Sequence, residues 1–141
     1  MTKRILVLDE TIIGNHLKIN LESLLGYKVN NFNFVTGAVV SAYLNGLSFY
    51  DVFLVEPFLN GHWPESLAFP LMRDFCHKNI PVIFTSTQNK YSLQRDLGLK
   101  QGVHYSHYIQ KPYDIEGLIP VLMGSVGDKR ELEDYAVAVD H

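Results

Sequence analysis

Residues 50–61 of this chain read YDVFLVEPFLNG, and this stretch decides the fold. Its apolar run, Val52 to Val55, fits a strand that is buried on both faces of a parallel sheet. An acid, Glu56, follows directly, and the Asn-Gly turn signal at 60–61 indicates that the acid begins a loop. Because ligands bind at the carboxyl ends of the strands in open α/β sheets, Glu56 is the first candidate for a functional residue.

The rest of the chain repeats this alternation of apolar strand and amphipathic helix. Apolar or alternating segments predict five strands, at 4–8, 27–35, 51–55, 80–84 and 105–109. Helical spacing predicts five helices, at 13–25, 35–44, from Pro64 to Asn79, at 91–97 and at 113–123. Pro70 is expected to kink the third helix or to delay its start. The pattern predicts a flavodoxin-like α/β fold: a doubly wound, five-stranded parallel sheet in the order 2-1-3-4-5, with helices on both faces.

Length and composition fit one globular domain, which we expect at 1–124, followed by a charged tail or linker at 125–141. The formal charge of −3 comes without clustered basic residues, so nucleic-acid binding is not favoured. The single cysteine, Cys76, excludes an internal disulfide framework and is expected to be a small buried apolar residue. No apolar run is long enough for a membrane span or a signal peptide, so a cytoplasmic protein is predicted.

Polar side chains follow four of the predicted strands. The acids Asp9 and Glu10 follow the first strand, Glu56 the third, Ser86 the fourth and Lys111 the fifth. The first and third strands are neighbours at the switch point of the sheet, so we expect the three carboxylates to lie close together. They would repel one another unless Lys111 or a metal cation lay among them. Mg²⁺ prefers such oxygen ligands, so this edge of the sheet is a candidate magnesium site.

Five motifs occur in order along the chain: ILVLDE at 5–10, LESLLGYKV at 21–29, DVFLVE at 51–56, PVIFTS at 81–86 and YIQKP at 108–112. In this order and at these spacings they resemble the receiver domain of two-component response regulators, the CheY-like superfamily. The resemblance runs from Arg4 to about Leu122. In that family, an aspartate at the end of the third strand accepts a phosphoryl group from a partner histidine kinase.

The resemblance implies a role for each residue at the strand ends. Asp9 and Glu10 stand where the family holds Mg²⁺, and Ser86 and Lys111 stand where it contacts the phosphoryl oxygens. Tyr108 matches the aromatic residue that changes rotamer together with the hydroxyl residue, and a role in the core is an equal alternative for it. The family also has a cis bond between this lysine and the following proline, so we expect Lys111-Pro112 to be cis.

The departures from the family pattern lie at the same site. Glu56 replaces the accepting aspartate, and its extra methylene carries the carboxylate about 1.5 Å further out. A misplacement of about 1 Å can lower a rate on the order of a hundredfold. Thr87 stands where a very small residue is usual, and Pro57 stiffens the loop whose Phe58 carbonyl would be a metal ligand. We therefore predict a pseudo-receiver in which Mg²⁺ binding is weak or absent and the Glu56 carboxylate reaches toward Lys111.

The first functional hypothesis is a signalling interaction module that does not depend on phosphorylation and is not an enzyme. Its partner would be a histidine kinase or an output protein, and the family's usual face, formed by the fourth helix, fifth strand and fifth helix, carries Tyr91, Tyr105 and Tyr113. A homodimer could use the same face. The alternatives are a receiver that is phosphorylated on another residue, with Asp9 the nearby aspartate, and a flavodoxin-like small-molecule binder, which shares the architecture. For the first hypothesis no organic cofactor is expected.

Two further features have structural explanations that compete with functional ones. His104 and His107 lack a paired cysteine or acid, so ordinary loop and strand histidines are favoured over a metal site. In the tail, four apolar residues at helical spacing predict an amphipathic stripe: Leu132, Tyr135, Ala136 and Val139. The stripe would pack on the last helix or on a second copy of the protein, and a frayed terminus is the alternative.

Overall fold

In the computed structural model, which describes residues 2–59 and 68–130, five parallel strands form one sheet in the order β2-β1-β3-β4-β5. The strands are β1 (Arg4–Leu8), β2 (Lys28–Phe32), β3 (Val52–Val55), β4 (Val82–Ser86) and β5 (His107–Gln110). This is the order predicted from the sequence. It places the carboxyl ends of β1 and β3 side by side, where the connections leave the sheet in opposite directions.

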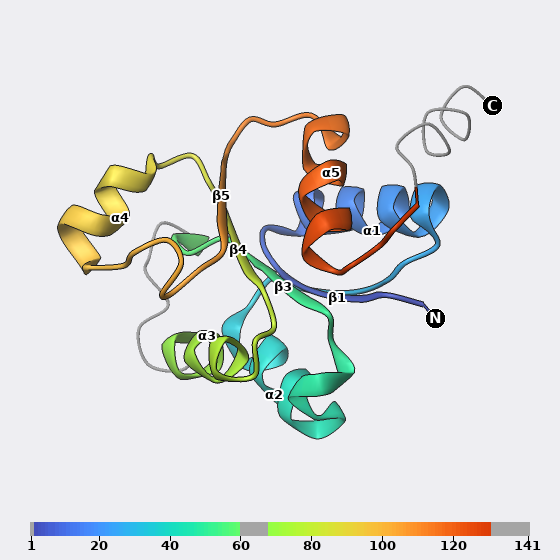
Figure 1. Ribbon diagram of the computed structural model, residues 1–141, viewed down its shortest axis with the longest axis horizontal. Helices are drawn as coiled ribbons and strands as arrows, with labels where there is room; N and C mark the ends of the chain where they lie inside the picture. Colours follow the sequence, from blue (N-terminus) through green and yellow to red (C-terminus); the bar gives the residue numbers. More distant parts are fainter. Residues whose placement is uncertain (1, 60–67, 131–141) are drawn as a thin grey trace.

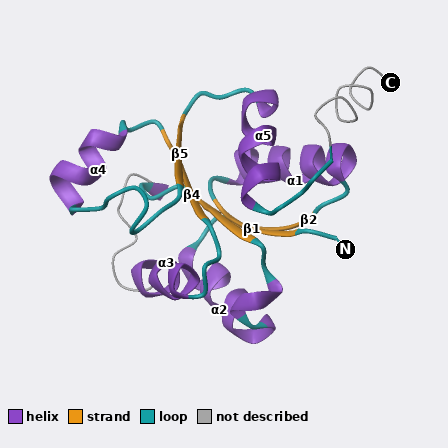
Figure 2. Ribbon diagram, viewed as in Figure 1, coloured by secondary structure: helices purple, strands orange, loops and turns teal. Residues whose placement is uncertain are grey.

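Helices cover both faces of the sheet (Figures 1 and 2). They are α1 (Thr11–Leu25), α2 (Val35–Asn45), α3 (Ala68–His77), α4 (Lys90–Leu97) and α5 (Ile115–Ser125), with a short 3₁₀ helix, η1 (Leu47–Phe49). Figure 1 shows α1 and α5 together on one face and α2 and α3 on the other. The helix α1 ends at Gly26, which is left-handed with φ of 71°, as its position after the last apolar residue predicts.

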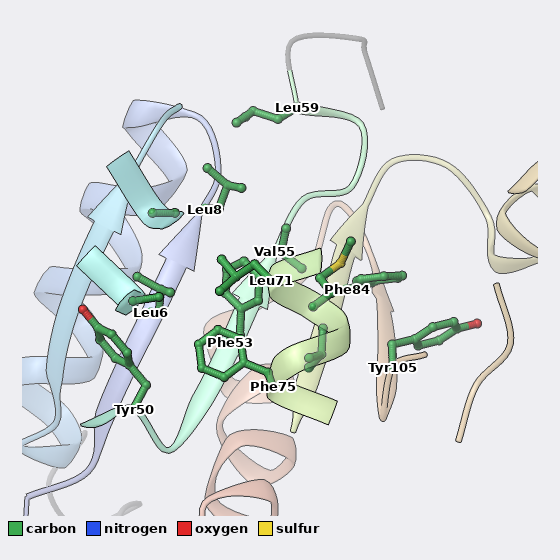
Figure 3. Packing of buried hydrophobic residues seen from close by; sticks show 14 of the residues in the cluster. Leu6, Leu8, Tyr50, Phe53, Val55, Leu59, Leu71, Phe75, Phe84 and Tyr105 are labelled. Atoms are coloured by element: carbon green, nitrogen blue, oxygen red, sulfur yellow. The ribbon is translucent and has the colours of Figure 1, made fainter. Parts of the chain in front are cut away.

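The core consists of two apolar clusters, one on each face of the sheet. Alternate strand residues such as Phe53, Val55 and Phe84 face α2 and α3, and Figure 3 shows them with Leu71 and Phe75 of α3. The intervening residues face the second cluster, together with α1 and α5. All four residues of β3 are buried, which confirms the prediction of a strand covered on both faces.

The predicted boundaries of three strands are wrong by up to three residues. The strand β2 ends at Phe32 rather than at 35, because Phe34 is already the N-cap of α2, which begins at Val35. The strands β4 and β5 lie later than predicted, since their pairing continues to Ser86 and Gln110. Tyr105 therefore precedes β5, although its ring still reaches the core and stacks on Phe84 at 4.6 Å between ring centroids.

Two predicted helical segments lie partly or wholly outside the described residues. The predicted helix start at Pro64 lies outside the described residues, and Pro70 lies in the first turn of α3 as described from Ala68. The predicted apolar stripe at 132–139 also lies outside them. The domain boundary at 124/125 stays a prediction, but the residues that follow it contact the domain: Val126 is buried, and an Arg130 nitrogen donates to the Leu25 carbonyl at 2.8 Å. No helix in the described ranges is long and apolar enough to cross a membrane.

Candidate functional site

The sheet register brings three polar residues into one row at the carboxyl ends of the strands. Leu8 pairs with Val55, and Val55 pairs with Phe84. The next residue on each strand is polar, so Asp9, Glu56 and Thr85 continue the same ladder one step further. Because paired residues of a parallel sheet point to the same face, these three side chains lie next to one another. We call them the polar row.

The ammonium group of Lys111 neutralises part of this row. Its Nζ lies 2.9 Å from Asp9 Oδ1 and 3.4 Å from Glu56 Oε1. The side chains of Lys111, Asp9 and Glu56 are only 9%, 2% and 8% exposed, so the three charges interact out of contact with bulk water. Two carboxylates face one ammonium, which leaves the cluster with one net negative charge when all three are ionised. The contact between Lys111 and Glu56 is the one expected from the sequence.

Both carboxylate oxygens of Asp9 have hydrogen-bond donors. Oδ1 accepts from the Glu10 backbone N–H at 2.7 Å in addition to Lys111, and Oδ2 accepts from the Thr85 hydroxyl at 3.3 Å. Thr85 is fully buried in the sheet. Sequence reasoning identified Ser86 as the hydroxyl of the site and missed Thr85. The strand register carries the missing signal, because it aligns Thr85 with Asp9 and Glu56.

Glu56 is held at the start of the loop that follows β3. Its Oε2 accepts from the Phe58 backbone N–H at 3.3 Å, so the loop folds back over the carboxylate. Burial raises the pKa of Glu56, and the nearby Lys111 ammonium acts against that rise. The buried carboxylate is thus more easily protonated than an exposed glutamate, in spite of its cationic neighbour.

The remaining residues expected at the site lie around the row. The Ser86 hydroxyl is buried and accepts from the Gln88 backbone N–H at 3.1 Å, whereas Thr87 is exposed. The Tyr108 hydroxyl is buried and has no hydrogen-bond partner in the described part of the chain. Burial raises the pKa of Tyr108. The Lys111-Pro112 bond is cis, as predicted. The functional roles of these residues stay predictions.

The described side chains do not form a ready magnesium site. Glu10, expected to be a ligand, has an exposed side chain, and both Asp9 oxygens are occupied by donors. Glu56 shares Lys111 with Asp9, so an ammonium already lies where the two carboxylates face each other. Over residues 2–59 and 68–130 no group of three His, Cys, Asp or Glu side chains could hold a metal ion.

Other residues singled out in the sequence lie away from the row. His104 is fixed in a turn, where its Nδ1 accepts from the Lys100 backbone N–H at 2.9 Å. Cys76 is half-buried rather than fully buried; burial raises its pKa, and its thiol donates to the His104 carbonyl at 3.3 Å. The expectation of three interface tyrosines is wrong for Tyr105, which is 4% exposed, whereas Tyr91 is 71% exposed.

The third of those tyrosines, Tyr113, is half-buried with its hydroxyl inside the protein. Burial raises its pKa, and the charges of Asp9 and Glu56 raise it further. Tyr113 therefore contributes more to the interior beside the polar row than to an exposed interface. Of the aromatic residues predicted for the face formed by α4, β5 and α5, Tyr91 alone is mostly exposed.

Solved structures with the same fold are receiver domains. The chemotaxis response regulator CheY4 of Vibrio cholerae matches 89% of this chain and 99% of its own, with 17% identity and a TM-score of 0.68. A response regulator receiver protein from Burkholderia phymatum matches 89% and 96%, with 16% identity and a TM-score of 0.69. The receiver domain of a sensor histidine kinase from Pseudomonas aeruginosa, crystallised with a magnesium ion in its active-site cleft, matches 91% and 100%, with 22% identity and a TM-score of 0.66.

These likenesses establish the fold as that of CheY-like receiver domains. Comparison of the sequence with protein-family models and with curated proteins finds no match.

Proposed function

We propose that this domain is a receiver-like module of two-component signal transduction that acts in the cytoplasm through protein contacts and does not depend on phosphorylation. The observation that carries the proposal is the state of Glu56. It lies at the end of β3, is buried, and has one oxygen against the Lys111 ammonium and the other against the Phe58 N–H. A carboxylate that acts as a nucleophile needs a free oxygen aimed at the incoming phosphorus.

The geometry supports a built-in anion in place of an acquired one. Lys111 already has two carboxylate partners, and the longer Glu56 side chain brings negative charge to the lysine without any covalent step. A module of this kind would have its binding surface permanently formed. Its partner would bind that surface whether or not the domain is phosphorylated.

Asp9 gives little support to the alternative of a second acceptor. Its side chain is 2% exposed, and its oxygens accept from Lys111, Thr85 and the Glu10 N–H. A phosphodonor would have to displace these donors and open the sheet edge before it could reach either oxygen. The free-energy cost of leaving such buried donors without acceptors is about 1–3 kcal/mol for each of them.

The test is incubation with Mg²⁺ and acetyl phosphate, followed by intact-mass measurement. The unmodified chain should gain no phosphoryl group, and Glu56→Gln should behave in the same way. Glu56→Asp, which shortens the side chain, should gain a detectable fraction. A stable phosphoryl group on the unmodified chain would overturn the proposal. If Glu56→Asp also stays unmodified, the block lies in the loop at Pro57 and Phe58 and in Thr87 rather than in side-chain length.

We further propose that partners bind the face formed by α4, β5 and α5, and that a homodimer could form there. Tyr91 on α4 supports this choice, because it is 71% exposed and tyrosine is enriched at protein interfaces and among the residues that contribute most to binding. Replacing Tyr91 with Ala should weaken partner binding or self-association by about tenfold or more without unfolding the domain. Sedimentation of both forms is the first measurement. Unchanged binding would move the partner surface elsewhere.

A further inference from the structure

A second site lies away from the polar row, between α3 and the chain that connects α4 to β5. A cavity of about 560 Å³ opens there, which is within the range of small-molecule pockets. Its apolar wall includes Phe69 and Met72 of α3 and Leu99 and Val103 of the connection. It shares no residue with the polar row. Val103 is 64% exposed, so it lies at the solvent side of this apolar wall.

Both walls of this cavity are firmly held, so it does not need to be formed by a ligand. Gly98 ends α4 in the left-handed region with φ of 69°, and the next amide, from Leu99, returns to the Leu93 carbonyl at 3.4 Å. Leu93 and Leu99 are 0% and 5% exposed, which anchors this wall in the core. The Cys76 thiol of α3 joins the walls by donating to the His104 carbonyl at 3.3 Å. Preorganised walls lower the entropic cost of binding.

The lining includes one cationic side chain and two imidazoles. The Arg73 side chain is 66% exposed, and its Nε lies 3.9 Å from Asp74 Oδ1, which is a long ion pair. His104 is also part of the wall, and its Nδ1 is occupied as an acceptor from the Lys100 N–H. Its other ring nitrogen, Nε2, must then carry the proton when the ring is neutral, so it is a donor. His77 adds a second imidazole.

An apolar chamber with cationic and N–H donors at its opening is complementary to an apolar molecule that ends in an anion. We propose that this cavity binds a small apolar carboxylic acid, with the hydrocarbon or ring against Met72, Leu99 and Val103 and the carboxylate at Arg73 and His104. Guanidinium and N–H donors match the two oxygens of a carboxylate. The half-buried Asp74 is an acid next to this opening: its Oδ2 accepts from the Tyr43 hydroxyl, and its Oδ1 lies 3.9 Å from Arg73 Nε, a long ion pair that a bound carboxylate would replace.

The proposal is tested by titration calorimetry of the whole chain with octanoate and with octanamide. Octanoate should bind, and the uncharged octanamide should bind about tenfold more weakly or worse, because it cannot form charge-assisted hydrogen bonds. Arg73→Gln should weaken octanoate binding about fivefold, less than a buried pair would give, since the Arg73 side chain is 66% exposed. Lys78→Gln is the matched control: it removes the same charge from an exposed residue just beyond α3 that is not part of the wall, and it should leave the affinity unchanged.

Two further measurements locate the bound molecule. Val103→Trp should abolish binding by filling the chamber, and because Val103 is exposed the substitution does not disturb the core. Cys76, the only cysteine of the chain, lies in the wall, so octanoate should slow its alkylation by iodoacetamide several-fold. The proposal is overturned if octanoate does not bind at millimolar concentration, if octanamide binds equally well, if Val103→Trp binds normally, or if Lys78→Gln is as harmful as Arg73→Gln. These results are independent of the phosphodonor experiment, so either proposal can fail alone.

Discussion

Replacing Lys111 with Met would remove the cation that pairs with both acids of the polar row and roughly keep the length of the side chain. Asp9 and Glu56 would then face each other at the end of the sheet with 2% and 8% of their side chains exposed. Neither carboxylate could turn outward without breaking its backbone contacts, since Asp9 also accepts the Glu10 N–H and Glu56 the Phe58 N–H. The variant would hold two adjacent buried negative charges.

The size of the effect follows from the distances. At 2.9 and 3.4 Å, and with an effective dielectric constant of about 20, the ammonium attracts the two carboxylates by about 6 and 5 kcal/mol. Most of this attraction is offset by the cost of removing the three charges from water. Removal of one partner loses the attraction and keeps the desolvation of the others, so breaking a buried pair typically costs about 3–5 kcal/mol. We expect Lys111→Met to lower the free energy of unfolding by that amount at neutral pH.

Urea denaturation followed by far-ultraviolet circular dichroism measures this loss. Lys18→Met is the matched control, because Lys18 also pairs with an acid, Glu22, at 3.1 Å, but the two side chains are 44% and 32% exposed. An exposed helical pair contributes about 0.3–0.5 kcal/mol, and Lys18 also donates to the Val29 carbonyl, so the control should lose about 1 kcal/mol. Both substitutions remove a lysine that pairs with an acid. The difference between their losses in the free energy of unfolding therefore measures the effect of burying the ion pair.

The pH dependence gives an independent check of the same reasoning. Burial raises the pKa of Glu56, so between its ordinary pKa and the raised one the folded state holds the proton more tightly than the unfolded state. Stability therefore falls as pH rises through that window. Without Lys111 the pKa of Glu56 should rise further and the window should widen upward. Lys111→Met should regain part of its lost stability in mildly acidic buffer, and Lys111→Met with Glu56→Gln should be more stable than Lys111→Met alone at neutral pH.

A loss of less than about 1 kcal/mol for Lys111→Met, similar to the control, would refute the reasoning, because it would mean that the carboxylates are not held in a dry cluster. A stability that does not change between mildly acidic and neutral pH would refute the burial of Glu56 in particular.

Two other substitutions test single hydrogen bonds. Thr85→Val keeps the shape of a fully buried side chain but removes the donor to Asp9. It should lower the free energy of unfolding by about 1–2 kcal/mol in urea denaturation. An unchanged midpoint would mean that the 3.3 Å hydrogen bond does not contribute to stability. Tyr27→Phe removes a hydroxyl that donates to Asp128 at 2.7 Å in a residue that is 2% exposed, and it should cost about 1–2 kcal/mol in the same assay. Tyr43→Phe, at a residue that is 49% exposed, is its control and should cost less than about 0.5 kcal/mol.

The fold could be predicted from the sequence because its signals are local and agree with one another. The apolar runs at β1 and β3 and the left-handed Gly26 each specify their own element without help from distant residues. The boundaries of β4 and β5 are different, because they depend on how the two strands pair. Ser86 belongs to β4 since it lies opposite Gln110, and nothing within five residues of Ser86 carries that information.

The site was predictable as a set of strand ends but not as a set of contacts. The sequence indicates that Asp9, Glu56 and Lys111 meet, because all three follow strands of one parallel sheet at its carboxyl edge. It does not indicate that the Thr85 hydroxyl donates to Asp9, because strand side chains alternate and a register shift of one residue exchanges the faces. The sequence also suggested exposed aromatics in the region of β5, whereas Tyr105 turns inward to stack on Phe84.

Both oxygens of Asp9 already have donors, and this limits which ligands could bind at the polar row. A ligand shifts a conformational equilibrium only by its difference in affinity for the two states, and an anion or metal at the row would first have to displace Lys111 or Thr85 from Asp9. The proposed carboxylate cavity has no such cost. Its wall continues along the chain to Tyr105, whose ring stacks on Phe84, and Phe84 precedes Thr85 in β4. Phe84 faces the α2 and α3 side of the sheet and Thr85 the opposite side, so the cavity and the polar row lie on opposite sides of β4 and a molecule in the cavity would leave the contacts of Asp9 in place.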